Sequence, residues 1–282
     1  MSETISIVIN VDTRPGWDQD LSQQSTMMNG TRSFDFMSEG VRNKVKAFKD
    51  FETEVTLFVD VHEPLTQEAM FVLDHMMNVE KILDNLVINR HNEGFLGQDY
   101  FPKFNDLNFL NAMIMSRGKY LVHFDGDMNI FLPNSDFIKK HLKMLDDGTY
   151  DYISYPSPWS PDAVHDPDFQ DYMWASTRFF MCKRSIIDYS EILACLVDSD
   201  YMYDKYGDKK RRCPWLEHVL GIMAGKGRVF YPPFDAAEAL IFSWSRYMSG
   251  TLSKLNAVTY AQVLAFVTQN GGVQYPCDVR CS

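Results

Sequence analysis

The chain has 282 residues, and its 27 Lys and Arg against 38 Asp and Glu give a formal net charge of −11. This acidity argues against nucleic acid as the main partner, because clustered Lys and Arg bind most phosphate backbones. With 45% hydrophobic and 23% charged residues, the composition is that of a folded globular protein. No run approaches the roughly 18 apolar residues that a membrane span requires.

The five cysteines are odd in number and include no CxxC pair, so we expect reduced thiols, with a Cys277–Cys281 pair as the alternative. The N-terminus starts with MSET and lacks the basic and apolar regions of a secretory signal. Both features predict a cytoplasmic protein.

Apolar, β-branched runs alternate with helical periodicity through the first half of the chain. Strands are predicted at residues 5–11, 55–61, 86–89 and 120–124. Helices are predicted between them, at residues 34–48, 66–79 and 107–116. This alternation predicts an α/β fold with parallel crossovers and an open sheet. The second half is less regular, with strands predicted at 150–155 and 177–182 and helices at 186–197 and 215–225.

The sharpest polar feature is Asp125-Gly126-Asp127, which follows directly on a predicted strand. Ligands of open α/β sheets bind at the carboxyl ends of the strands. Two carboxylates two residues apart can converge on one hard cation, such as Mg²⁺ or Mn²⁺, which completes its shell with phosphate oxygens. The alternative is an ordinary turn after a strand. An acidic protein needs such a cation to hold a polyanionic substrate.

Three segments together resemble the GT-A glycosyltransferases, most closely their family 2-like members. Residues 5–16, ISIVINVDTRPG, are similar to the first strand of that family and the turn after it. Residues 54–63, EVTLFVDVHE, are similar to the second strand, whose terminal Asp contacts the nucleotide base. Residues 118–130, GKYLVHFDGDMNI, match the Gly-x-Tyr strand that leads into the DxD motif. The sequence departs from the family at Asn10 and Val11, which replace the usual Pro-Thr.

The resemblance implies a GT-A (Rossmann-like) fold, with an open, mostly parallel sheet flanked by helices and a C-terminal extension. It implies nucleotide contacts from six positions, which are Val11, Thr13, Arg14, Asp60, Asp125 and Gly126. It also implies a cofactor, Mn²⁺ or Mg²⁺, held by Asp125 and Asp127.

A later segment, CPWLEHVLGIMAGKG at residues 213–227, resembles the helix whose Glu-Asp pair supplies the catalytic base of inverting members. Here Glu217 and His218 stand in place of that pair. Glu217 is the first choice as base, because a carboxylate can remove the proton of an attacking sugar hydroxyl. His218 is the rival, as a base or a third metal ligand. The remaining alternative is that Glu217 is a first-turn acid favoured by the helix dipole.

The resemblance therefore implies a metal-dependent glycosyltransferase of the hexosyltransferase type. Such an enzyme moves a sugar from a nucleotide-diphosphate sugar to a glycan or other hydroxyl acceptor. The donor that we expect is a UDP-sugar. We expect inversion, although the same fold also serves retention. Residues 1–127 are expected to bind the donor, residues 128–230 to bind the acceptor and carry the base, and residues 231–282 to pack on the same domain.

Two other functions fit parts of the pattern. A non-catalytic nucleotide- or sugar-binding homologue would keep the fold without the base, which the Glu-His pair makes possible. A phosphohydrolase with an aspartyl nucleophile also places Asp-x-Asp after a strand. Against the phosphohydrolase, Met128 follows the motif, no Thr comes after it, and the motif is not on the first strand.

Overall fold

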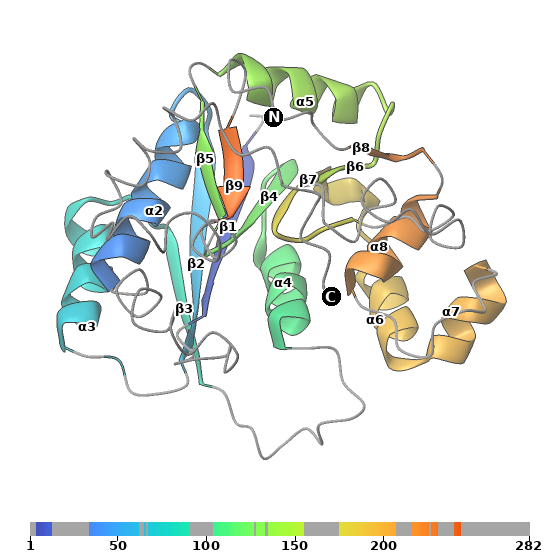
Figure 1. The fold of residues 1–282 in the computed structure, drawn as a ribbon, viewed down its shortest axis with the longest axis horizontal. Helices are drawn as coiled ribbons and strands as arrows, with labels where there is room; N and C mark the ends of the chain where they lie inside the picture. The colour runs from blue at the N-terminus through green and yellow to red at the C-terminus, as the bar shows by residue number, and fades with distance from the viewer. Residues whose placement is uncertain are drawn as a thin grey trace, which may run out of the picture.

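A seven-stranded sheet with helices on both faces forms the centre of the computed structural model (Figure 1). The structure describes residues 4–12, 34–61, 65, 67–90, 104–126, 128–132, 135–154, 175–206, 216–225, 227–230 and 240–243. The strand order is β3-β2-β1-β4-β7-β6-β8, and a separate two-stranded sheet pairs β5 with β9.

The strands are β1 Ile5–Asp12, β2 Thr53–Val61, β3 Asn85–Arg90, β4 Tyr120–Asp125, β5 Met128–Phe131, β6 Tyr152–Ser154, β7 Phe179–Lys183, β8 Val229–Phe230 and β9 Leu240–Ser243. The helices are α2 Phe34–Ala47, α3 Gln67–Asp74, α4 Phe104–Met115, α5 Asp136–Asp146, α6 Tyr189–Val197, α7 Ser199–Tyr206 and α8 Leu216–Ala224. A π-helical turn, His75–Val79, continues α3, and a 3-10 turn, Arg184–Ile186, follows β7.

Parallel pairing dominates the large sheet. Strand β1 pairs in parallel with β2 and β4, β2 with β3, and β6 with β8. Strand β7 runs antiparallel to both of its neighbours, β4 and β6. The prediction of an open, mostly parallel α/β sheet flanked by helices is therefore confirmed.

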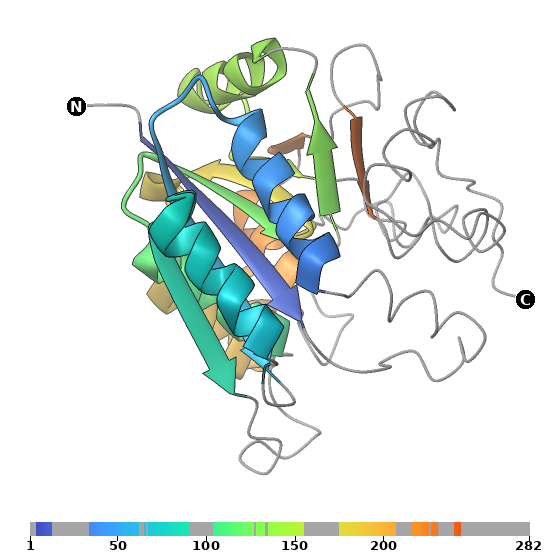
Figure 2. The same ribbon diagram turned by 90° about the vertical axis from the view of Figure 1, so that its left-hand side faces the viewer.

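The side chains of alternate strand residues enter two separate cores, one on each face of the sheet. In β1, Ile5, Ile7 and Ile9 enter the core that α2, α3 and α5 cover, whereas Val8 enters the core beneath α4, α6 and α8. Figure 2 shows α2 and α3 side by side over the first face. This alternation follows from the two-residue period of a strand, so every second strand-end residue points to the same side of the sheet.

Helices α5 and α7 and strands β5, β8 and β9 were not among the predicted elements. The buried face of α5 consists of Phe137, Ile138, His141, Leu142 and Leu145, which have the three- and four-residue spacing of an amphipathic helix. Strand β9 comes from the predicted C-terminal extension and pairs with β5 immediately after the Asp125-Gly126-Asp127 motif.

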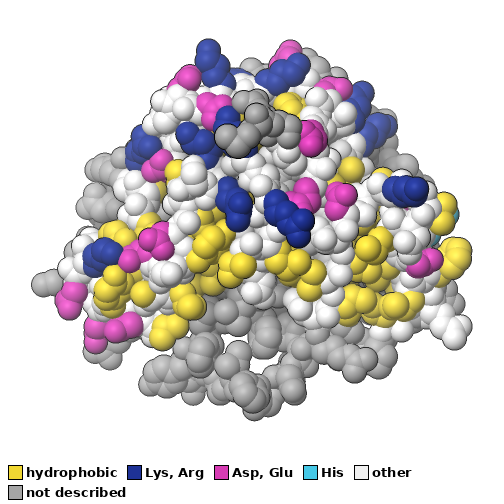
Figure 3. Space-filling model, turned by 180° about the vertical axis from the view of Figure 1, so that it is seen from behind, with side chains coloured by type: hydrophobic (Ala, Val, Ile, Leu, Met, Phe, Trp, Pro, Cys, Tyr) yellow, Lys and Arg dark blue, Asp and Glu magenta, His cyan; other side chains and the backbone are white. Residues whose placement is uncertain are grey.

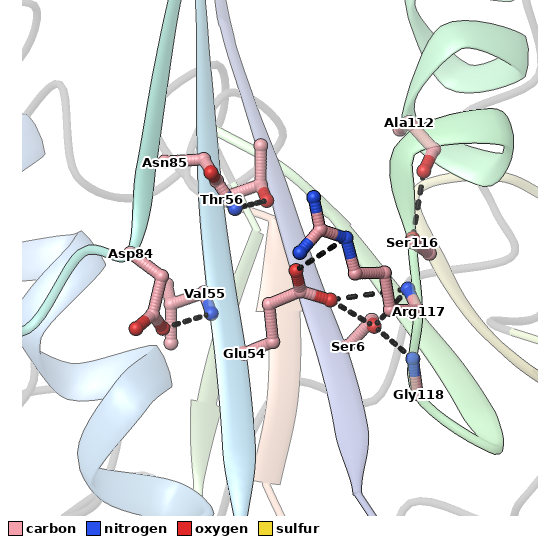
Figure 4. A network of polar contacts seen from close by, with 10 residues as sticks. All are labelled: Ser6, Glu54, Val55, Thr56, Asp84, Asn85, Ala112, Ser116, Arg117 and Gly118. Carbon is pink, nitrogen blue, oxygen red and sulfur yellow. Dashed lines mark hydrogen bonds and ion pairs between the residues drawn. The ribbon is translucent and has the colours of Figure 1, made fainter.

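A polar network at the amino-terminal edge of the sheet fixes how β4 enters it (Figure 4). The Ser6 hydroxyl donates to Glu54 Oε2 at 2.9 Å and accepts from the backbone N–H groups of Arg117 and Gly118 at 3.2 and 2.8 Å. A Cβ at Gly118 would lie 2.5 Å from the Thr4 carbonyl oxygen. The loop before β4 is therefore held against β1. This contact sets the register of β4, which places Asp125 at the carboxyl ends of the strands.

Hydrophobic side chains gather in a band across the face shown in Figure 3. Over the described residues as a whole, the exposed large hydrophobic side chains include Phe71 in α3, Ile114 in α4 and Val197 in α6. Among the helices that the structure describes, none is long and apolar enough to cross a membrane. The cysteines among the described residues are Cys182 and Cys195, and both are buried free thiols.

Candidate active site

The carboxyl ends of β1, β2 and β4 lie side by side and bring the predicted site positions together. Across the strand pairs, Asn10 is the register partner of Asp125, and Asp12 is that of Asp60. The side chains of Asp12 and Asp60 are outside the described part of the structure, although their backbones belong to the strands. The predicted donor contacts Thr13 and Arg14 and the predicted metal ligand Asp127 also lie outside the described residues.

Val11 was predicted to contact the nucleotide, and its side chain is buried in the core at 2% exposure. A contact from this position would therefore have to come from its backbone. Gly126 packs closely against the same strand, because a Cβ there would lie 2.9 Å from the Asn10 carbonyl oxygen and 3.2 Å from Val11 Cα. A glycine lets the turn after β4 approach the end of β1 so closely.

The turn after β4 is also bound by its other neighbours. The Asp125 N–H donates to the Arg178 carbonyl at 2.8 Å, just before β7 begins. From α2, Lys44 Nζ donates to the Gly126 carbonyl at 3.2 Å, and Asn43 Nδ2 donates to the Ile130 carbonyl at 2.7 Å. The backbone around Asp125 is thus fixed by β1, by α2 and by the segment that precedes β7.

Glu217 lies in the first turn of α8, directly after Leu216, and is half-buried. Its Oε1 accepts from the Thr177 N–H at 2.8 Å and from the Thr177 hydroxyl at 3.3 Å. Its backbone carbonyl accepts from the Ala175 N–H at 3.0 Å. Within the described residues no hydrogen bond ends on Oε2, so this oxygen is the one available to accept a proton. These contacts bind the first turn of α8 to residues 175–177, a segment outside the helix.

His218, the rival to Glu217, is 1% exposed, like its helix neighbours Val219 and Leu220. A base or metal ligand has to reach the substrate, so this burial disfavours both roles that the sequence left open for His218.

His123 is a site residue that the sequence reasoning did not select. It lies in β4 two residues before Asp125, is 1% exposed, and packs edge-on against Phe109 with ring centroids 4.5 Å apart. Its Nδ1 is 2.5 Å from the Thr177 carbonyl, so Nδ1 carries the proton and donates. Burial lowers the pKa of His123 to about 3, which keeps the ring neutral. The sequence does contain a signal for His123, because it is a histidine in an otherwise apolar strand, two residues before Asp125.

Thr177 therefore links two parts of the site. Its carbonyl accepts from His123 in β4, and its N–H and hydroxyl donate to Glu217 in α8. The adjacent Arg178 carbonyl binds the Asp125 N–H. Residues 175–178 thus hold both the end of the strand that carries Asp125 and the carboxylate of Glu217.

The chemistry of the donor atoms near Asp125 suits a hard cation. Asp125 is half-buried, and Asn10 lies across from it on β1. The Oδ1 of Asn10 is buried and has no hydrogen-bond partner among the residues that the structure describes. Carboxylate and amide oxygens are ligands that Mg²⁺ and Mn²⁺ prefer. No group of three or more His, Cys, Asp or Glu that could hold a metal occurs in the described ranges, which do not include Asp127.

Neither a protein-family model nor a curated protein matches this chain. Solved structures do resemble it. The galactosyltransferase LgtC, in complex with donor and acceptor sugar analogues, is 11% identical at a TM-score of 0.46, covering 82% of this chain and 74% of its own. The mannosyltransferase Ktr4p from S. cerevisiae is 12% identical at a TM-score of 0.43, covering 84% of this chain and 70% of its own.

A Bacillus anthracis protein described as a glucose-1-phosphate thymidylyltransferase, in complex with a sucrose, is 8% identical at a TM-score of 0.49. That likeness covers 96% of this chain and 97% of the other. These likenesses are distant, so the fold assignment rests on the strand order and directions of the chain itself.

Proposed function

We propose that the protein is a glycosyltransferase that moves a sugar from a nucleotide-diphosphate sugar to an acceptor hydroxyl. The observation that supports this most strongly is the segment at residues 175–178, which binds both the Asp125 end of β4 and the carboxylate of Glu217. A donor site and a base held by one segment are what a single displacement at a sugar carbon needs.

The donor would bind at the carboxyl ends of β1, β2 and β4. We place the nucleotide against the backbone of Val11, the turn at Thr13 and Arg14, and the Asp60 carboxylate. The diphosphate would lie over Gly126, whose missing Cβ leaves the turn close to the end of β1. A UDP-sugar is the favoured donor, in keeping with the family resemblance of the motifs.

Asp125 and Asp127 would hold Mn²⁺ or Mg²⁺. When bound, the cation neutralises charge on the departing diphosphate. Because the chain has a net charge of −11 and its site is rich in carboxylates, a polyanionic donor should bind poorly without that cation.

Glu217 would act as the base. The Thr177 N–H and hydroxyl hold its Oε1, which directs Oε2 to the hydroxyl of the acceptor. As the acceptor oxygen attacks the anomeric carbon, Oε2 takes its proton, and the configuration at that carbon is inverted. His218, which is buried, takes no part in this step.

We place acceptor binding in residues 128–230 and expect the segment 231–282 to complete the same domain. A glycan or another hydroxyl compound would be the acceptor, and a cytoplasmic location would supply nucleotide sugars. The test is release of the nucleotide diphosphate from a panel of UDP- and GDP-sugars, with Mn²⁺ and with excess EDTA. Release that requires Mn²⁺ supports the proposal, and release that is undiminished in EDTA contradicts it.

A further inference from the structure

Lys44 is a completely buried lysine in α2, with 0% of its surface exposed. Transfer of an ammonium group out of water is strongly unfavourable unless the group is well paired and hydrogen-bonded. By contrast, Lys46, two residues further along the same helix, is exposed. A buried cation in a surface helix therefore points to a specific role for Lys44.

The ammonium group of Lys44 reaches the turn that carries the proposed metal ligands. Its Nζ donates to the Gly126 carbonyl oxygen at 3.2 Å. That carbonyl belongs to the peptide bond between Gly126 and Asp127, and a peptide group is planar. The hydrogen bond from Lys44 therefore orients the whole peptide group that follows Gly126.

The neighbouring residue of α2 holds the other side of the same turn. Asn43 Nδ2 donates to the Ile130 carbonyl of β5 at 2.7 Å, and α2 packs along β5. Helix α2 is thus bound to the chain both before and after Asp127. With the Asp125 N–H bonded to the Arg178 carbonyl and the Gly126 carbonyl bonded to Lys44, the backbone on both sides of Asp125 is held by hydrogen bonds.

We propose that Lys44 is a positioning residue for the cation site at Asp125 and Asp127. Its hydrogen bond holds the Gly126 carbonyl, and with it the planar peptide group that follows Gly126. This role rests on the proposed function, since it requires that the turn bind a cation. Lys44 acts through the turn and does not touch the donor.

The first test needs neither cation nor donor. Lys44→Met keeps the buried methylene chain and removes the ammonium, and Lys46→Met is the matched control in the same helix. In the ligand-free protein, we expect amide hydrogen exchange in peptides that cover residues 120–131 to become about 10-fold faster in Lys44→Met and to stay at the wild-type rate in Lys46→Met. An exchange rate within twofold of wild type in a folded Lys44→Met protein would overturn the positioning role.

The second test measures binding of Mn²⁺ alone, from the electron paramagnetic resonance signal of the free ion. We expect Lys44→Met to bind Mn²⁺ about 10-fold more weakly than wild type, with Lys46→Met unchanged. Equal affinity in wild type and Lys44→Met would overturn the role of Lys44 and leave the proposed function standing. A wild-type protein that binds no Mn²⁺, alone or with UDP, would overturn the proposed function and with it this role. Lys44→Gln, which keeps a neutral donor, is the second variant for both assays if Lys44→Met does not fold.

Discussion

Replacing Glu217 with Gln tests the base directly, because the change removes one negative charge and preserves the shape of the side chain. The Gln carbonyl can still accept from the Thr177 N–H, which bonds Glu217 at 2.8 Å. A hydrogen bond to a charged group contributes about 1 kcal/mol more than a neutral one, so the free energy of unfolding should fall by about that amount. For a chain of this size we expect the melting temperature to fall by less than about 4 °C.

Turnover should change far more than stability. An amide cannot accept the proton of the acceptor hydroxyl, and general-base catalysis contributes about 10²- to 10⁴-fold to a rate. We expect kcat to fall by about 10³-fold, which corresponds to about 4 kcal/mol of transition-state free energy. The affinity for the nucleotide diphosphate should stay within about twofold, because Glu217 lies in α8 and not at the strand ends proposed to bind the donor.

The assay is acceptor-dependent release of the nucleotide diphosphate, paired with calorimetric titration of that nucleotide in the presence of Mn²⁺. Glu52→Gln, at an exposed position before β2, is the matched control and should behave as wild type. Unchanged kcat in a folded Glu217→Gln protein would refute the assignment of the base. Equal loss of nucleotide binding and turnover would show that Glu217 supports the fold of the site and not the chemistry.

Three further predictions concern the turn and its support. Gly126→Ala places a Cβ 2.9 Å from the Asn10 carbonyl, so we expect a loss of about 1–3 kcal/mol in urea unfolding; an unchanged midpoint would contradict the close packing. In Asp127→Ala, Mn²⁺ should no longer increase the affinity for UDP measured by calorimetry. An increase as large as in wild type would show that this residue does not bind the cation. His123 stays neutral when folded but titrates near pH 6.5 when unfolded, so the unfolded chain binds more protons at low pH. Stability should therefore fall as the pH drops below about 6.5 towards about 3, by about 1.4 kcal/mol at pH 5.5. His123→Gln should lose that part of the pH dependence in denaturant titrations, and an identical slope in both proteins would argue against a neutral buried ring.

The central strands could be predicted from the sequence because their signals are local. Strands β1, β2 and β4 are mainly apolar, since helices cover both faces of the sheet, and each has an aspartate at or next to its carboxyl end. The register then places Asn10 beside Asp125 and Asp12 beside Asp60, as the parallel order requires. The strand-end part of the site was therefore accessible from sequence alone.

Other features depend on contacts between distant residues. Helix α5 is the exception, because Phe137, Ile138, Leu142 and Leu145 already have the spacing of an amphipathic helix in the sequence, although no helix was predicted there. The β5–β9 pair joins residues more than a hundred positions apart in two four-residue strands, which carry almost no local signal. The contacts of Thr177 with His123 and Glu217 span 54 and 40 residues and arise only once β4, β7 and α8 have come together.

The position of Lys44 also depends on packing that the sequence does not show. In the sequence it is one of two lysines near the end of an amphipathic helix, where basic residues are ordinary. Only the packing of α2 against β5 brings its ammonium group to the Gly126 carbonyl. A local pattern identifies residues that can do chemistry, but it does not identify the buried residues that hold them in place.

The most direct test of the central claim is a thermal-shift panel of UDP, GDP and their sugar derivatives, each measured with and without Mn²⁺. A donor site built on Asp125 and Asp127 in a chain with a net charge of −11 should bind a nucleotide diphosphate only when the cation is present. We therefore expect at least one nucleotide to raise the melting temperature by several degrees with Mn²⁺ and to leave it unchanged without Mn²⁺. Two results would contradict a cation-dependent nucleotide-sugar site. One is stabilisation of the same size in EDTA, and the other is that no nucleotide raises the melting temperature with or without Mn²⁺.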